Sequence, residues 1–406
     1  MSVYFSYRSI IIDNSPTRKT QPNRSRLIWT LGNLGAWDRF TKRTPPDISH
    51  AAVIVHAPNH LGDNIMSIPL VMSLLDRNVR VSIVSRSEYA FIWTRLSKRL
   101  HVISYQGWCR NEVRQLRKTL LEHDADVAFL LATGMEVARL YLRAGVKHRL
   151  GFDYWGRGFL LTARLRSYHE PSSPHLVDEH HSENMMRLLS LLPQTNSYIS
   201  DNKASTCLNR PPLFEFDKGN TDDRNVDTKE IILGIALAGN TLDKSPSTEF
   251  WRSVISKLGK KRGPDRIKLL GIADQRQMGN QLRQGNEHIE NLCGDTDVES
   301  LMNQLLDCDV VISPDSGIAH LAAACGIPVI VLFTSGAPSW TRPVGNSVTI
   351  LSSNISCSPC FNRQGCQQKY SCVSTLDTDR VVTAILETGS FFHLDPWSIE
   401  ERKRLA

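Results

Sequence analysis

The sequence predicts an α/β protein made of two doubly wound domains that face each other across a cleft. Short apolar runs alternate with segments of helical periodicity, which is the pattern of parallel sheets covered by helices. At 406 residues the chain exceeds what one ordinary core holds. A polar stretch containing Pro211 and Pro212 separates two such series and is typical of a linker. The expected segments are an extension, a first domain, a linker, a second domain and a tail: 1–50, 51–195, 196–228, 229–390 and 391–406.

The composition is that of a globular protein, with 41% hydrophobic and 22% charged residues. Apolar runs such as 329–333 are far too short to span a membrane. The N-terminus lacks the apolar core of a secretory signal, so we expect a cytoplasmic protein. The formal charge of +7 favours an acidic partner, namely a phosphorylated substrate, an anionic membrane surface or a nucleic acid. Nucleic acid is disfavoured because no module that binds it is recognisable.

The extension over 1–50 is basic, and its segment 27–40 mixes aromatic and aliphatic residues with basic flanks. Such a segment is typical of an amphipathic helix that lies on an anionic membrane face. Gly32 and Gly35 weaken a helix there, so a segment packed on the first domain is the favoured alternative.

The first domain is expected to open with a strand, a glycine-bearing turn and a helix. The apolar run 53–57 predicts the strand, and helical spacing of apolar residues predicts a helix over 63–75. Asp63 stands at the amino end of that helix, directly after Gly62. The further expected strands are 79–85, 126–131 and 149–152, and the further helices are 111–122, 136–144 and 180–192.

The second domain is expected to repeat this alternation. Its predicted strands are 231–238, 268–272, 309–313 and 329–333, and its predicted helices are 248–259, 275–284, 298–306 and 318–325.

The turn Pro314–Gly317 is the most informative site in the second domain. It lies at the carboxyl end of a strand and the amino end of a helix, where open α/β sheets bind ligands and where unpaired N–H groups suit a phosphate. Gly317 lets the backbone approach a ligand, Asp315 can cap the helix or hold a sugar hydroxyl, and His320 can reach the same anion. The alternative is a capping Asp, a turn Gly and a surface His.

Four cysteines occupy 16 residues as C-x2-C-x5-C-x5-C. This spacing is typical of a structural four-thiolate site for zinc or iron, with reduced surface thiols or two disulfides as alternatives. A disulfide framework is disfavoured in a chain without an export signal. The cysteines are Cys357, Cys360, Cys366 and Cys372, in the segment 357–372.

Several motifs resemble one family in the same order. APNHLGDNIMSIPLVMSLL (57–75) resembles the amino-terminal motif of the bacterial ADP-heptose:lipopolysaccharide heptosyltransferases, glycosyltransferase family 9. PDSGIAHLAAACGIPVIVLF (314–333), with the following Pro338 and Pro343, is similar to the donor-site signature of that family. The stretches 126–153 and 180–192 resemble two further segments, so the resemblance covers about 53–386.

The resemblance implies a GT-B type fold, in which two Rossmann-like domains bind the acceptor and the ADP-sugar donor respectively. Asp63 matches the catalytic carboxylate of the family. Lys244 matches a phosphate-contacting lysine, but Ser245-Pro246 follows it at once, where the family has longer spacing, so a solvated loop lysine is the alternative. The implied donor-binding residues are Thr241, Lys244, Asp315, Ser316, Gly317 and His320.

The chemistry implied is an inverting single displacement. Asp63 would take the proton of the acceptor hydroxyl, while the helix amino end at 317–320 and Lys244 would stabilise the departing diphosphate without a metal. A plain helix cap is the alternative role for Asp63.

The function implied is transfer of a heptose from ADP-L-glycero-D-manno-heptose to the inner core of lipopolysaccharide, at the cytoplasmic face of the inner membrane. Alternatives are a protein acceptor of the autotransporter type, for which some relatives bind iron through a cysteine motif, or a small-molecule acceptor. An alternative of another class is a scaffold that binds a nucleotide-sugar without catalysis.

Overall fold

The computed structural model describes residues 52–77, 79–154, 156–165, 180–192, 230–261, 263–353, 355–362 and 365–388. The expected extension, linker and tail lie outside the described residues, and so does the amphipathic segment 27–40. The chain divides into two compact units at about residue 208, and each is described by itself. No helix in the described ranges is both long and apolar enough to cross a membrane.

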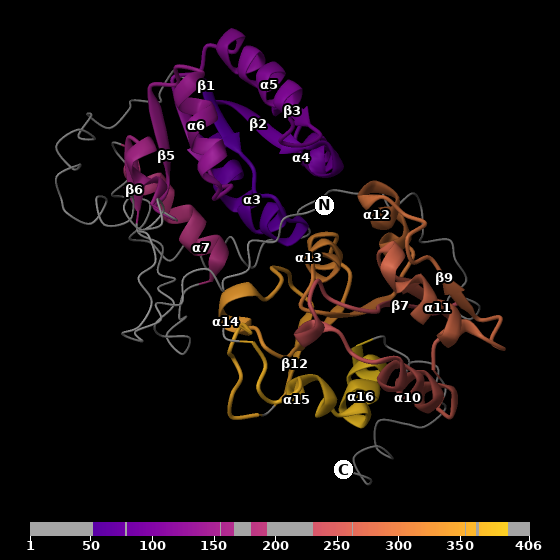
Figure 1. The fold of residues 1–406 in the computed structure, drawn as a ribbon. Coiled ribbons are helices and arrows are strands. Elements are labelled where there is room, and N and C mark those ends of the chain that lie inside the picture. Colours follow the sequence, from indigo (N-terminus) through magenta and orange to yellow (C-terminus); the bar gives the residue numbers. More distant parts are fainter. Residues whose placement is uncertain are drawn as a thin grey trace, which may run out of the picture. The chain divides into compact units, whose positions relative to one another are not determined.

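The first unit is built on a parallel sheet whose six described strands follow the order β3-β2-β1-β4-β5-β6 (Figure 1). This is a doubly wound order, with β1 at the centre between β2 and β4. Ile54 and Ala128 pack with α5 and α6 on one face, so their neighbours along the strands point to the other face. The strands are β1 Ala52–His56, β2 Arg80–Arg86, β3 His101–Tyr105, β4 Val127–Leu130, β5 His148–Phe152 and β6 Ala163–Leu165.

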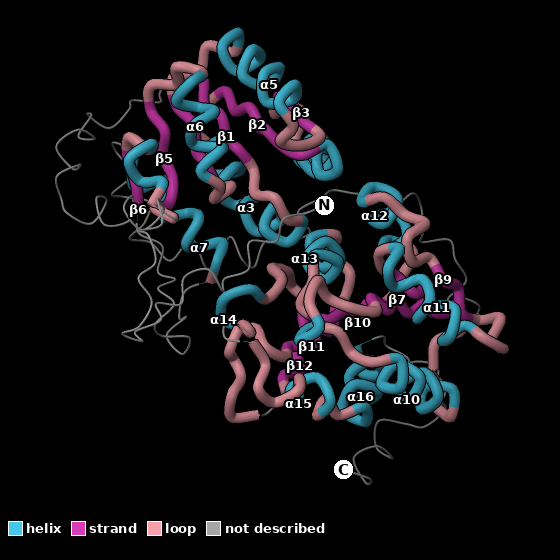
Figure 2. Tube along the Cα trace, in the orientation of Figure 1, coloured by secondary structure: helices cyan, strands magenta, loops and turns pink. Residues whose placement is uncertain are grey.

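Helices alternate with these strands, as the sequence predicts (Figure 2). The predicted helix 63–75 starts two residues early, and ten of its fifteen residues are buried, including Pro69. The predicted helix 180–192 is partly wrong, because only its first turns are α-helical and a 3₁₀ segment, Arg187–Leu191, follows. The helices are α3 Leu61–Leu75, α4 Ala90–Leu96, α5 Arg110–Glu122, α6 Met135–Arg143 and α7 His181–Met186, with 3₁₀ segments η2 Ser87–Tyr89 and η3 Arg157–Leu160.

The second unit repeats the design with the strand order β12-β11-β10-β7-β8-β9, again parallel throughout its described pairs. The fold class of two parallel α/β sheets is therefore confirmed. The strands are β7 Ile232–Ala236, β8 Arg266–Leu270, β9 Ile289–Asn291, β10 Val310–Pro314, β11 Val329–Phe333 and β12 Val348–Ser352. The helices are α10 Thr248–Gly259, α11 Arg276–Arg283, α12 Val298–Leu306, α13 Gly317–Ala324, α14 Pro338–Thr341, α15 Ser371–Ser374 and α16 Thr378–Thr388, with 3₁₀ segments η7 Leu242–Lys244 and η8 Ala273–Gln275.

The core of this unit joins strand residues to α10 and α16, which pack together. Trp251 of α10 is fully buried, and its indole N–H donates to the carbonyl of Leu237 at 2.8 Å. The only polar atom in the largest side chain of this core is therefore hydrogen-bonded, which avoids the free-energy cost of a buried, unpaired donor.

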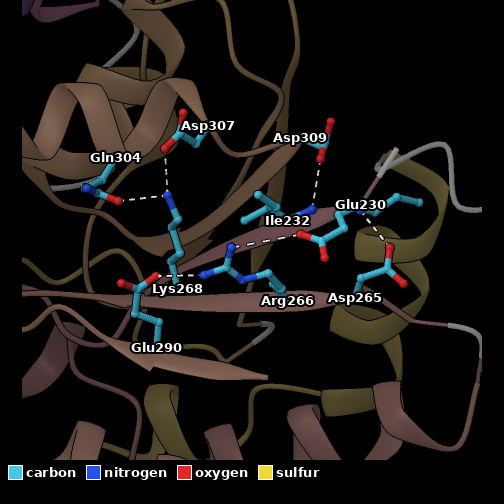
Figure 3. Close-up of polar contacts among 10 residues, drawn as sticks. Glu230, Ile232, Asp265, Arg266, Lys268, Glu290, Gln304, Asp307 and Asp309 are labelled. Carbon is cyan, nitrogen blue, oxygen red and sulfur yellow. Dashed lines mark hydrogen bonds and ion pairs between the residues drawn. The ribbon is translucent and has the colours of Figure 1, made fainter. Parts of the chain in front are cut away.

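Polar pairs close the amino-terminal edge of the second sheet (Figure 3). Lys268 of β8 is buried and donates to Gln304 at 2.8 Å and to Asp307 at 2.9 Å. Asp309 accepts the main-chain N–H of Ile232 at 2.9 Å, which aligns β7 with β10. These contacts stabilise the edge opposite the one where the candidate site lies.

Candidate active site

The turn after β10 differs in detail from the sequence prediction. Pro314 is the last residue of the strand, and the residue that precedes α13 is Ser316, in an extended conformation and without a capping hydrogen bond from its side chain. Of the two roles considered for Asp315, the structure therefore does not show the helix cap. The carboxylate of Asp315 instead accepts a hydrogen bond from Lys244 Nζ at 2.5 Å.

Lys244 and Asp315 are brought together by two loops at the carboxyl edge of the sheet, after β7 and after β10. The Asp315 side chain is 6% exposed and that of Lys244 is 24% exposed, so Lys244 is a partly buried, ion-paired residue and not the solvated loop lysine of the alternative interpretation. Thr241 stays exposed at the start of the same loop, where its carbonyl accepts the Lys244 N–H at 3.0 Å. An ammonium group and a buried carboxylate thus stand beside the first turn of α13.

Around this pair, the other predicted donor residues occupy the start of α13. Gly317 is its first residue, and Ser316 shares a hydrogen bond with Ser313 through their hydroxyls, 2.8 Å apart. His320 is buried, so it is not the surface histidine of the alternative interpretation. The unpaired N–H groups of a helix start, joined with one ammonium group, form an arrangement that suits a diphosphate.

Asp63 lies in the first turn of α3, in the other unit. The N-cap of α3 is His60, without a capping hydrogen bond from its side chain, so the alternative role of Asp63 as the cap is wrong. The Asp63 side chain is 33% exposed, and its Oδ1 lies 3.8 Å from Nε2 of His181 in α7. The Asp63 carboxylate is therefore accessible to solvent and has the His181 imidazole beside it.

His181 is a residue that sequence reasoning missed. Burial lowers its pKa below the ordinary value, and the Asp63 carboxylate opposes part of that shift. Its neighbour His180 has a different task, because it caps α7 together with Glu183. The two adjacent histidines are the only sequence signal that points to His181, but the sequence does not tell which of the two side chains faces another helix.

Asn64 fixes the turn that carries Asp63. Its amide Nδ2 donates to the carbonyls of Pro58 and His60, both at 2.8 Å, and its Oδ1 accepts from the Trp93 indole at 3.3 Å. Asn64 is fully buried, so these bonds are shielded from water and hold the start of α3 in one conformation.

A buried histidine lies at the end of β1, just before the same turn. His56 Nδ1 is 3.1 Å from the Tyr141 hydroxyl, and Nε2 is 3.3 Å from the Tyr105 hydroxyl. Complete burial, with a smaller effect of the Arg157 charge, lowers the pKa of His56 to about 3. The imidazole is therefore neutral at physiological pH and supports the site as a hydrogen-bonding group.

The four cysteines line one pocket in the second unit, together with the side chains of Asp243 and Asn362. Each cysteine is a free thiol, and Cys366 Sγ accepts the main-chain N–H of Tyr370 at 3.0 Å. Thiol donors fit zinc or iron chemically. Across the described ranges, however, no three His, Cys, Asp or Glu side chains are gathered as a ready ligand set.

Comparison with known proteins gives a consistent result. Residues 113–371 match the family described as glycosyltransferase family 9 (heptosyltransferase). Lipooligosaccharide heptosyltransferase 2 of Haemophilus influenzae is 31% identical over 90 residues, which are 21% of this chain and 26% of that relative. Lipopolysaccharide heptosyltransferase 2 of Escherichia coli K12 is 22% identical over 323 residues, which are 74% of this chain and 87% of that relative.

A solved structure shows the same fold. The E. coli ADP-heptose lipopolysaccharide heptosyltransferase II structure superposes with a TM-score of 0.64 and 19% identity, and the match covers 84% of this chain and 99% of that one. The GT-B-like fold expected from the sequence is therefore confirmed.

Proposed function

The chain belongs to glycosyltransferase family 9, the heptosyltransferases, and from this premise we propose that it transfers a heptose from ADP-L-glycero-D-manno-heptose to the inner core of lipopolysaccharide. One observation carries the donor side of this proposal. Lys244 and Asp315, both matched to donor-site positions of the family, lie 71 residues apart in the chain and meet at 2.5 Å beside the start of α13.

On the donor side, the leaving group is ADP, which departs with negative charge on its diphosphate. The Lys244 ammonium and the N–H groups at the start of α13 supply positive potential where that charge develops. Asp315 orients Lys244 before the donor arrives, and its carboxylate also suits a sugar hydroxyl.

On the acceptor side, Asp63 acts as the general base. Its carboxylate takes the proton of the acceptor hydroxyl while that oxygen attacks the anomeric carbon, and the bond from that carbon to the ADP oxygen breaks. A single displacement of this kind inverts the anomeric centre. General-base assistance typically contributes about 10²–10⁴-fold to the rate.

The acceptor assignment rests on the family and on charge. The net charge of +7 favours a phosphorylated, membrane-borne acceptor, and peripheral association with the cytoplasmic face of the inner membrane follows from such a substrate. Protein and small-molecule acceptors are the alternatives with the same chemistry, and a non-catalytic scaffold is the alternative of another class.

We propose further that the four cysteines hold a structural zinc or iron ion. Their shared pocket and the N–H···S hydrogen bond to Cys366 support this, because hydrogen-bond partners orient the ligands of metal sites. A bound ion would cross-link the segment that carries the cysteines and would take no part in sugar transfer.

The proposal is tested with a panel of donors and acceptors. The purified chain is incubated with ADP-heptose and heptose-deficient lipopolysaccharide, in parallel with other nucleotide-sugars and a protein acceptor. Heptose on the lipid with release of ADP supports the main proposal. Transfer to the protein alone would replace the acceptor assignment, and tight ADP binding without turnover for any pair would favour the scaffold.

A further inference from the structure

A buried carboxylate, Asp243, directly precedes the donor-site lysine. It is 4% exposed, and both of its oxygens accept hydrogen bonds from side chains of distant segments. Oδ2 accepts from the Ser335 hydroxyl, and Oδ1 accepts from the Asn362 amide at 3.1 Å. These two hydrogen bonds hold the Asp243 side chain firmly. Losing either donor would leave a carboxylate oxygen buried without a hydrogen bond, which costs free energy.

Two residues after β11 connect the donor loop to the cysteine-rich segment. The hydroxyl of Thr334 donates to the main-chain carbonyl of Asp243. The main-chain carbonyl of Ser335 accepts the N–H groups of Cys360 at 3.0 Å and Phe361 at 2.8 Å. Ser335 therefore binds Asp243 through its side chain and the cysteine-rich segment through its backbone.

The loop that carries Lys244 is closed on itself. The Gly239 N–H donates to the Lys244 carbonyl at 2.9 Å, and the Lys244 N–H donates to the Thr241 carbonyl at 3.0 Å. A Cβ at Gly239 would lie 2.6 Å from Cβ of Lys244, so this close approach requires glycine. Because the loop is compact, fixing Asp243 also fixes the backbone from which the Lys244 side chain extends.

We infer that Asp243 is a positioning residue of the donor site, which holds Lys244 against Asp315 by tying the donor loop to Ser335 and Asn362. This rests on the proposed donor function. Binding of a nucleoside diphosphate is favoured when the ammonium group is already in place, since no ordering is then needed. The cysteine-rich segment thereby acts on the affinity for ADP through Asn362, without contributing a group that touches the donor.

The test compares Asp243→Asn with the unaltered chain by calorimetric titration of ADP and by steady-state kinetics. The amide keeps the shape and removes the charge, so Lys244 loses its fixed position. Misplacing a group in a positioned site can lower the rate by up to about 100-fold. We therefore expect the Kd for ADP and the donor KM to rise by at least about tenfold, while the acceptor KM stays unchanged. A general loss of stability would not raise the donor KM while leaving the acceptor KM unchanged.

A control and a rescue sharpen the test. Asp309→Asn alters another hydrogen-bonded carboxylate of the same unit, which accepts the main-chain N–H of Ile232 at the opposite edge of the sheet. This variant should leave ADP binding unchanged. Adding Asn362→Asp to Asp243→Asn exchanges the two partners and should restore part of the ADP affinity, as a double-mutant cycle would show.

A folded Asp243→Asn variant with unaltered ADP affinity would overturn the inference. Should that variant not fold, Asn362→Ala removes one bond on the side of the cysteine-rich segment, and unchanged ADP affinity there would overturn it equally. If the unaltered chain does not bind ADP, the donor assignment itself is refuted, and the inference with it.

Discussion

Nε2 of His181 lies 3.8 Å from Oδ1 of Asp63, across the contact between α7 and α3. The imidazole is mostly buried, with 17% of its side chain exposed, while the carboxylate keeps 33%. His181 thus lies next to the proposed base, and we expect it to limit the positions that the carboxylate takes.

Replacing His181 by Ala should lower kcat about tenfold, because a small misplacement of a positioned reactive group can cost up to about 100-fold. The donor KM should not change, since the residues proposed to bind the donor belong to the other unit. Steady-state kinetics with ADP-heptose measure both quantities. His101→Ala, an exposed histidine of the same unit, is the control, and an unchanged kcat in His181→Ala would remove the positioning role.

Replacing Lys244 by Ala should weaken ADP binding by about 10–100-fold, which corresponds to about 1.4–2.8 kcal/mol. The variant loses the ammonium group and leaves the buried carboxylate of Asp315 without this partner. Titration calorimetry with ADP measures the effect. Lys257→Ala removes a lysine that pairs with the exposed Asp379 and should bind ADP like the unaltered chain, whereas equal losses in both variants would argue against a specific site.

The stability of the first unit should fall as the pH drops below about 6.5. The pKa of His56 is about 3 in the folded protein and about 6.5 when unfolded, so between these values the unfolded chain binds the additional proton. The free energy of unfolding should then decrease by up to about 1.4 kcal/mol per pH unit from this group. Urea unfolding at pH 7 and pH 5 measures the slope. His56→Gln should flatten it, and an identical slope in that variant would contradict the assignment.

The purified chain should contain about one zinc or iron ion, and removing it should lower the melting temperature. Elemental analysis and thermal unfolding before and after chelation measure these properties. Cys360→Ser should reduce the metal content, whereas Cys109→Ser, an exposed cysteine outside the cluster, should not. Equal metal content in the two variants would exclude the four-cysteine site.

Elements with strong local signals could be predicted from the sequence. The helices over 248–259 and 298–306 have the predicted limits, because apolar periodicity combines with the capping residues Ser247 and Asp297. The strand β3 was not predicted, since it lies at the edge of its sheet and buries only alternate residues near its end. Short edge strands carry too few apolar residues to stand out.

The candidate donor-site residues could be named from the sequence, but their contacts could not. The ion pair of Lys244 with Asp315 and the hydrogen bond of Asp243 with Asn362 join residues 71 and 119 positions apart, respectively. Contacts between side chains so far apart in the sequence depend on how the loops at the edge of the sheet pack together. The periodicity of the sequence does not predict that packing. Asp243 was missed for this reason, although it stands beside Lys244.

The most direct test of the account is the rate of heptose transfer by Asp63→Asn with saturating ADP-heptose and lipopolysaccharide acceptor. Asp76→Asn, at the other end of the same helix, is the matched control. We expect Asp63→Asn to lose about 10²–10⁴-fold in rate and to bind ADP normally, while the control keeps its activity. An unchanged rate in Asp63→Asn would contradict the proposed mechanism.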